Sequence, residues 1–394
     1  MKRIRPSIVA LLVVGLLPFA LPVRAEAPTY NPIELVRTLR TVQDQIVHGS
    51  RSAHAAHRKL ISNIADQLMK VQPEQWRDPR SLRAGILFAL SGGDPRVARS
   101  ILGLGNLPQD EDRLLRGALA HAEGRTSEAI ELLAGINPKA LDLTIGGHVA
   151  LIQATLLAKD EPKRAIPHFE MARLLAPGTL VEEAALRREI LMLSSLGEFE
   201  RFETLAARYM RRYRNSVYGH NFRRQLAVEI AGMKSWDKPE RLARLDTMLE
   251  VLSAAERQDV YLTMAEAGIL KGHVQLTKFA AQHASTPSAG KPAASPRSHV
   301  YEAAALIVTD DFENGLAKLK GVERSKLAAK DAELLDAALQ MAKQIRHVPE
   351  AGTAAPVEDT SERARDLASV GVRSIKSAQA AMTKVDAMMS AKSK

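Results

Sequence analysis

The sequence contains no cysteine among its 394 residues. This absence excludes disulfide bonds, thiolate metal sites and cysteine nucleophiles, and it leaves no residue that could accept a lipid anchor. Aromatic residues are also scarce, at 4% of the chain. Beyond the N-terminal segment no stretch is long and apolar enough to span a bilayer, so we expect the mature chain to be soluble.

The signature motifs of common enzyme classes are missing as well. The sequence has no GxxxxGK[ST] loop, no GxSxG elbow and no HExxH zinc motif. Glu182 and Glu183 are adjacent and would diverge on a helix, so we predict a solvated face rather than a catalytic dyad. Of the clustered histidines His48, His54 and His57, the last two would share a helix face at a spacing compatible with a metal. Because no carboxylate lies three or four positions from them, we favour surface histidines and expect no metal, no cofactor and no enzymatic activity.

The N-terminus has the three parts of a secretory signal peptide. Basic residues, an apolar run and a small-residue cleavage site follow one another there: Lys2, Arg3 and Arg5, then residues 8–23, then Ala25. We predict cleavage between Ala25 and Glu26, which would place the mature chain in the periplasm. A membrane anchor is the alternative, but the run falls short of the roughly 20 apolar residues that a spanning helix needs. Pro18 and Pro22 also interrupt its end.

The chain is basic, with a formal net charge of +10. Cleavage would remove Lys2, Arg3, Arg5 and Arg24 and no acidic residue, and would lower the net charge to +6. In the cytoplasm such a charge would suggest a nucleic-acid partner. After export we expect no nucleic acid, and the expected partners are acidic proteins or anionic envelope surfaces such as peptidoglycan.

Most of the chain shows the hydrophobic pattern of amphipathic helices. From Pro32 to His283, apolar residues recur at helical spacing, and Gly, Pro, Asn and Asp mark the breaks. Ala, Leu, Arg and Glu dominate, whereas alternating runs of Val, Ile and Thr are absent. The sequence therefore predicts an all-α fold.

An internal repeat is visible within these helices. Similar turn-and-helix segments begin at Gly93, Gly124, Asp160 and Gly197. Their anchor positions are Ala98, Ala129, Ala165 and Phe202, separated by 31, 36 and 37 residues. These separations bracket the ~34-residue period of tetratricopeptide repeats, in which small residues let two helices approach closely. We predict a tetratricopeptide-like helical-repeat solenoid with an extended surface.

Two Pro/Ser/Ala-rich breaks divide the C-terminal third. The predicted organisation after the signal peptide is a repeat domain over 26–284, a linker or loop over 285–298, a helical block over 299–347, a linker over 348–361 and an amphipathic helix over 362–394.

The most unusual local composition lies between Arg208 and Arg224, which we call the arginine segment. It contains six Arg residues and no acidic residue, with aromatic residues between them. Arg and Tyr anchor many protein interfaces, so we predict a partner surface here. The candidate residues are Arg208, Tyr209, Arg211, Arg212, Tyr213, Arg214, Tyr218, Arg223 and Arg224. The alternative is that the Tyr residues pack between helices while the Arg residues are solvated or paired with Glu.

Three segments resemble the MotC family of periplasmic flagellar motility proteins from rhizobia and related alphaproteobacteria. They are PIELVRTLRTVQDQIVHG at 32–49, the helix pair at 160–177 and YEAAALIVTDDFENGLAKL at 301–319. The resemblance implies a non-enzymatic chemotaxis and motility protein that is exported to the periplasm. It also implies an association with the periplasmic part of the stator subunit MotB that supports flagellar rotation. It supplies no catalytic residue.

Two other functions fit the same general pattern. Soluble lytic transglycosylases combine a signal peptide with a helical superhelix, but their catalytic Glu is followed by Ser, and this chain has no Glu-Ser pair. A general periplasmic repeat adaptor for envelope assembly stays open, because only its partner would distinguish it from a motility protein.

Overall fold

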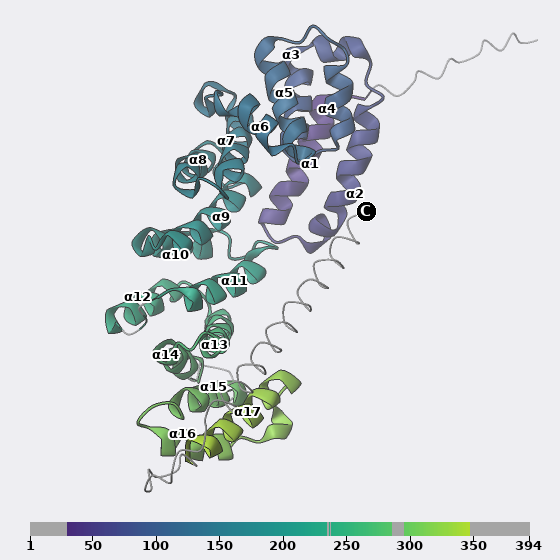
Figure 1. Ribbon diagram of the computed structural model, residues 1–394. Helices are drawn as coiled ribbons and strands as arrows, with labels where there is room; N and C mark the ends of the chain where they lie inside the picture. Colours follow the sequence, from purple (N-terminus) through teal and green to yellow (C-terminus); the bar gives the residue numbers. More distant parts are fainter. Residues whose placement is uncertain (1–29, 235, 237, 286–294, 347–394) are drawn as a thin grey trace, which may run out of the picture. The chain divides into compact units, whose positions relative to one another are not determined.

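The computed structural model describes residues 30–234, 236, 238–285 and 295–346. Within these residues the chain forms seventeen α-helices and three short 3-10 helices, at Pro73–Arg77, Pro138–Ala140 and Arg324–Lys326, and no strand (Figure 1). The α-helices are α1 (Pro32–Val47), α2 (Arg51–Leu68), α3 (Pro79–Leu90), α4 (Pro95–Leu102), α5 (Gln109–Ala122), α6 (Thr126–Ala134), α7 (Leu143–Leu157), α8 (Pro162–Leu175), α9 (Leu180–Leu196), α10 (Phe199–Arg212), α11 (Gly219–Gly232), α12 (Pro239–Leu249), α13 (Ala254–Leu270), α14 (Val274–Ser285), α15 (Pro296–Leu306), α16 (Phe312–Lys320) and α17 (Ala329–Arg346).

Short polar caps and prolines fix where many of these helices begin. At the start of α3, Asp78 accepts a hydrogen bond from the backbone N–H of Ser81 at 3.0 Å. Asp94 accepts one from the backbone N–H of Arg96 at 2.9 Å at the start of α4. A proline follows each of these two caps, where its missing N–H costs no helical hydrogen bond. Caps of this kind contribute about 1 kcal/mol each.

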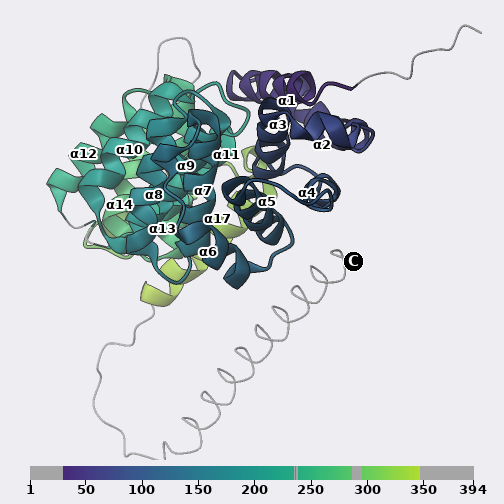
Figure 2. The same cartoon turned by 90° about the horizontal axis from the view of Figure 1, so that it is seen from above.

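Consecutive helices pack as pairs, and most contacts join elements that are neighbours in the sequence (Figure 1, Figure 2). The pairs α3–α4, α5–α6, α7–α8 and α9–α10 correspond to the four predicted repeats. The anchors Ala98, Ala129, Ala165 and Phe202 lie on the second helix of each pair and are buried. The prediction of an all-α fold built from repeated helix pairs is confirmed.

Glycine lets some of these pairs approach closely. A Cβ on Gly117 of α5 would lie 2.4 Å from Leu133 Cδ2 of α6. On α13, a Cβ on Gly268 would lie 2.5 Å from the side-chain oxygen of Thr277 of α14. No real Cβ tolerates such distances, so the missing side chain is what allows the two helices to pack so closely.

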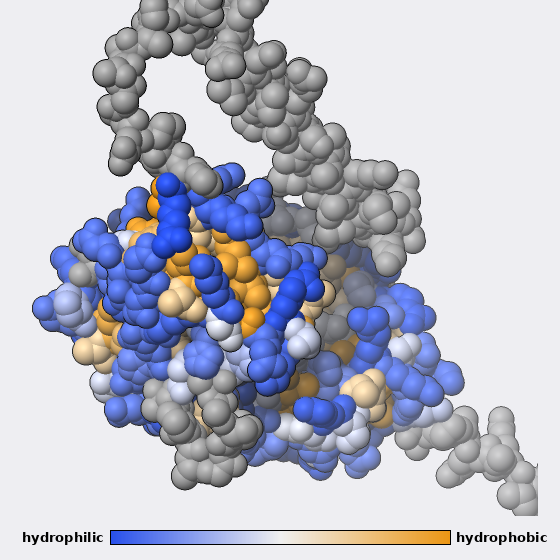
Figure 3. All heavy atoms as spheres, turned by 90° about the horizontal axis from the view of Figure 1, so that it is seen from below, coloured by the Kyte–Doolittle hydropathy of each residue, from blue (hydrophilic) through white to orange (hydrophobic). Residues whose placement is uncertain are grey.

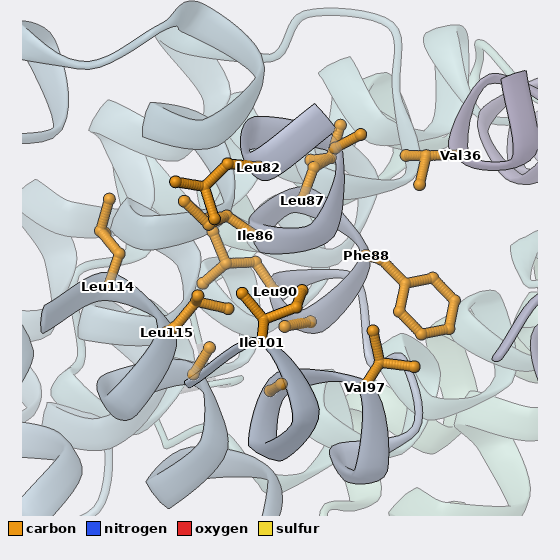
Figure 4. Close-up of a cluster of buried hydrophobic side chains, with 14 of the residues drawn as sticks. Val36, Leu82, Ile86, Leu87, Phe88, Leu90, Val97, Ile101, Leu114 and Leu115 are labelled. Atoms are coloured by element: carbon orange, nitrogen blue, oxygen red, sulfur yellow. The ribbon is translucent and has the colours of Figure 1, made fainter. Parts of the chain in front are cut away.

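The N-terminal helices share one hydrophobic core (Figure 4). Val36 of α1, Phe88 of α3 and Ile101 of α4 are among its buried side chains. Leu114 and Leu115 of α5 also belong to this core and are labelled in Figure 4. Burying a side chain of this size contributes about 1.5–3 kcal/mol, so α1 and α3 are firmly held by their inner faces.

Contacts divide the chain at the middle of α17. The described residues up to Leu335 belong to one compact unit, and a second unit begins at Asp336. Helices on both sides of the predicted linker 285–298 belong to the first unit, because α15 packs against α13 and α14. Ser285 ends α14, and residues 296–298 begin α15. The predicted signal peptide with Ala25 and Glu26, the 348–361 linker and the 362–394 helix lie outside the described residues.

Hydrophobic side chains are exposed in places on the surface. Figure 3 shows a face on which hydrophilic residues surround a smaller hydrophobic area. Among the described residues, Leu143, Leu174 and Leu270 are each more than 60% exposed, at 64%, 67% and 76%. None of the helices that the structure describes is long and apolar enough to cross a membrane.

Candidate functional site

The arginine segment covers the end of α10, the connection that follows, and the first part of α11. Tyr209, Tyr213 and Phe222 lie in the interior, with exposed fractions of 0%, 1% and 2%. The Tyr209 ring centre is 4.3 Å from that of Phe222 and 5.6 Å from that of Tyr213. These three aromatic residues thus pack against one another where α10 meets α11.

The hydroxyl groups of the two Tyr residues donate to two buried carboxylates on α9. Tyr209 donates to Glu183 Oε1 at 2.8 Å, and the Tyr213 hydroxyl donates to Glu182 Oε2 at 2.7 Å. Ser216 also donates to Glu183 Oε1, at 2.7 Å. The prediction that Glu182 and Glu183 lie on a solvated face is therefore wrong: they are 5% and 0% exposed. Buried carboxylates persist because hydroxyl donors replace the water they lose.

Burial sets the protonation of this network. It raises the pKa of Glu183 above its ordinary value, whereas the hydrogen bonds from Ser216 and Tyr209 lower it. Burial also raises the pKa of Tyr209 and Tyr213, so both phenols stay neutral and act as donors. The second carboxylate oxygen of Glu183 is buried without a hydrogen-bond partner. The network is therefore sensitive to the loss of either donor.

The arginine side chains fall into two groups. Arg212 Nε lies 3.2 Å from Glu182 Oε2, and Arg214 lies 2.8 Å from Glu256. Arg223 is 7% exposed and lies 3.3 Å from the same Glu256. The second group, which is exposed and forms no ion pair with any residue the structure describes, consists of Arg208, Arg211 and Arg224.

Burial divides the nine predicted contact residues. Tyr209, Tyr213 and Arg223 are buried and face their own helices, so they offer no surface to a partner. For these three the packing alternative describes the structure, because the two Tyr hydroxyls donate to carboxylates of α9 and Arg223 pairs with Glu256. The exposed candidates are Arg208, Arg211, Arg212, Arg214 and Arg224, and Tyr218 is half-buried.

Tyr218 joins the arginine segment to the N-terminal helices. Its ring lies beneath the guanidinium of Arg187, 4.6 Å away, and meets the His54 ring edge-on at 5.4 Å. The neighbouring Val217 N–H donates to the carbonyl of Ile46 at 3.3 Å. The connection between α10 and α11 is thus held from both sides, by α9 and by α1 and α2. Sequence reasoning missed Arg187, since nothing local marks it as a ring-stacking residue.

The histidines near the N-terminus do not form a metal site. His54 contacts Tyr218, and His48 Nδ1 lies 2.7 Å from the carbonyl of Asp44 on its own helix. Across the described ranges, no group of three His, Asp or Glu side chains could hold a metal ion. Instead of remaining on the surface, His57 is half-buried, and burial lowers its pKa.

A third carboxylate of α9 is also buried. Glu189 is 0% exposed and accepts a hydrogen bond from Arg173 Nε at 2.8 Å. Burial raises the pKa of Glu189 to about 7, although Arg173 lowers it. This ion pair joins α8 to α9, and Arg201 of α10 lies 3.9 Å away. Sequence patterns did not identify this charged cluster of Arg173, Glu189 and Arg201, because its three residues come from three different helices.

Comparison with known proteins shows which family the chain belongs to. The chain is 28% identical over 324 residues to the chemotaxis protein MotC of Rhizobium meliloti (strain 1021), covering 81% of this chain and 73% of that protein. No solved structure matches the chain. The family model described as "Chemotaxis protein MotC" matches residues 1–394. The chain therefore belongs to the MotC family of chemotaxis proteins.

Proposed function

We propose that this chain is a non-enzymatic motility protein of the periplasm that binds the periplasmic part of the stator subunit MotB and supports flagellar rotation. Membership of the MotC family supports a role in motility. The predicted signal peptide and the absence of catalytic motifs in the sequence favour a secreted binding protein over an enzyme.

The observation that carries the proposal is the set of exposed arginines in the arginine segment. Arg208, Arg211 and Arg224 have no ion-pair partner among the described residues, so their charge is available to an acidic surface. The hydrogen bond between Tyr209 and Glu183 helps to hold the backbone of α10, which carries Arg208 and Arg211. A cluster of unpaired positive charges favours electrostatically steered association with an acidic surface.

A tetratricopeptide-like repeat scaffold would suit this role mechanically. Stacked helix pairs provide area and rigidity rather than reactive groups. Binding would act on the stator by preferring one conformation of its periplasmic part over another, which shifts the population toward the preferred one. In this proposal the preferred conformation is the one engaged with the motor.

A deletion strain tests the cellular role. We expect cells that lack this protein to assemble normal filaments but to swim poorly, and the wild-type gene to restore swimming. A gene with Arg208→Glu and Arg211→Glu should not restore it, whereas Lys320→Glu, a reversal of an exposed cation on α16, should. Loss of the filaments themselves would instead support a general adaptor in envelope assembly. Release of fragments from cell-wall substrate by the purified protein would contradict the non-enzymatic assignment.

A further inference from the structure

Two adjoining pockets lie between α1, α3 and α7, away from the arginine segment in the sequence. The basic pocket is lined by Arg37 and Arg40 of α1 and by Arg80 and Arg83 of α3, and it holds about 290 Å³. The apolar pocket, next to it, holds about 440 Å³. Arg40 and Thr144 line both pockets, so the two form one continuous site.

Helix geometry explains why four guanidinium groups meet there. On each helix the two arginines are three residues apart and therefore lie on the same face. The inner faces of α1 and α3 are fixed in the core by residues such as Val36 and Phe88. Because α1 packs directly on α3, the two arginine-bearing faces line one pocket.

The charge of the basic pocket is not neutralised by the protein. Within the described residues, Arg37, Arg40 and Arg80 form no ion pair, and the Arg83 Nε donates to the carbonyl of Pro79 at 3.1 Å. Asp142 is the one carboxylate in the described lining of this pocket, and it caps the N-terminus of α7. Four guanidinium groups against one carboxylate leave a charge of +3 facing the pocket.

The apolar pocket offers hydrophobic contact together with hydrogen-bonding groups. Leu143 at its mouth is 64% exposed, and Leu90 and Val181 form part of its wall. Gln43, Asp44 and Thr144 also line it, and the Thr144 hydroxyl already donates to Asp142. A volume of this size is typical of sites that take small ligands or a few residues of a peptide.

His57 supplies a further sign of a missing partner. It lines the apolar pocket, and its Nε2 is buried without a hydrogen-bond partner in the structure. His148, on the same wall, is already satisfied: its Nε2 lies 3.1 Å from Ser91 Oγ and its Nδ1 lies 2.7 Å from the carbonyl of Thr144. Buried polar atoms are rarely left without a partner, so His57 fits a site completed by a ligand.

From these observations we propose that the joined pockets bind an acidic peptide segment, with carboxylates in the basic pocket and a neighbouring apolar side chain in the apolar pocket. Arginine forks match carboxylates in a bidentate manner, which suits Asp, Glu or a chain terminus. A lipid would place its acyl chain against Gln43 and the carboxylate of Asp44, whereas peptide amides can donate hydrogen bonds to both groups. The proposal does not depend on which protein supplies the segment.

Selection from a library of random eight-residue peptides on the immobilised full-length protein tests the site. We expect the enriched peptides to combine Asp or Glu with Leu, Ile or Phe. Arg40→Gln with Arg80→Gln should weaken the binding of a selected peptide at least about tenfold, because charge-assisted hydrogen bonds to its carboxylates are lost. Leu143→Ser should weaken it severalfold, and the matched control Arg58→Gln, an exposed arginine of α2 outside both pockets, should not.

Several results would overturn the proposal. Enriched peptides without acidic residues, or equal affinity for the wild-type protein and the Arg40→Gln/Arg80→Gln variant, would show that the basic pocket does not bind carboxylates. Binding to vesicles of anionic phospholipid that depends on the same arginines, without any selected peptide, would assign the site to lipid. All four substituted positions are exposed, so equal melting temperatures of the variants and the wild type are expected and would exclude misfolding.

Discussion

Removing the hydroxyl group of Tyr209 should destabilise the protein by about 2 kcal/mol. The substitution Tyr209→Phe keeps the ring against Phe222 but deletes the 2.8 Å hydrogen bond to Glu183. Ser216 would then be the remaining donor that the structure gives this carboxylate, whose other oxygen already has no partner. Hydrogen bonds to charged groups contribute about 1.5–3 kcal/mol, and leaving a buried acceptor unsatisfied costs a similar amount.

Urea unfolding at pH 8 measures this effect, with Tyr30→Phe as the control. Tyr30 forms no side-chain hydrogen bond that involves its hydroxyl within the described residues, so its substitution should be nearly neutral. When Glu183 is already replaced by Gln, the Tyr209 hydroxyl donates to a neutral amide instead of a carboxylate. The loss of unfolding free energy caused by Tyr209→Phe should then fall to about 1 kcal/mol. A cost below 0.5 kcal/mol, or the same cost in both backgrounds, would refute the account of the buried network.

Two further substitutions test the packing and the protonation of the helices. Gly117→Ala should destabilise by about 1–3 kcal/mol, because its Cβ would lie 2.4 Å from Leu133 Cδ2, whereas Gly321→Ala, with no neighbour closer than 3.5 Å, should be tolerated. Equal urea midpoints for the two variants would contradict the close-approach argument. Burial raises the pKa of Glu189 from 4.5 to about 7, so the folded chain holds this proton more tightly and Glu189 makes the free energy of unfolding fall as the pH rises between those values. The difference between the wild type and Glu189→Gln should therefore change by up to about 3 kcal/mol from pH 4.5 to pH 7, and a constant difference would show that the Arg173 ion pair keeps the carboxylate charged throughout.

The sequence predicted the helix pairs well because the signals for them are local. Periodicity and turn residues placed the repeats, and the anchors Ala129 and Phe202 are buried as a repeat requires. Gly124 and Gly197 adopt positive φ angles of 73° and 75° at the predicted turns. Each of these features depends on residues within one helix pair.

Burial of polar residues could not be predicted in the same way. Glu183 was predicted to lie on a solvated face because adjacent carboxylates diverge on a helix, whereas its hydrogen-bond donors Tyr209 and Ser216 lie 26 and 33 positions further along the chain. The contact between His54 and Tyr218 joins helices even further apart in the sequence. Such pairings follow from the path of the chain, which composition and periodicity do not determine.

For the same reason the arginine segment was only partly interpreted. Its composition was compatible with a partner surface and with helix packing. The structure shows which of its side chains are buried and which are exposed. Tyr209 and Tyr213 point into the interior, while Arg208 and Arg211 lie three positions apart on the exposed side of α10. A helical segment of mixed composition can serve both purposes because its two faces are in different surroundings.

The central claim is that exposed arginines of this segment bind the periplasmic part of MotB, and a binding measurement between the two purified proteins tests it most directly. We predict that Arg208→Glu with Arg211→Glu lowers the affinity at least about tenfold, mainly through a slower association rate that responds less to salt. Lys320→Glu, which reverses an exposed charge elsewhere on the chain, should leave the binding unchanged. An unchanged affinity in the folded double variant, or no binding by the wild type, would contradict the claim.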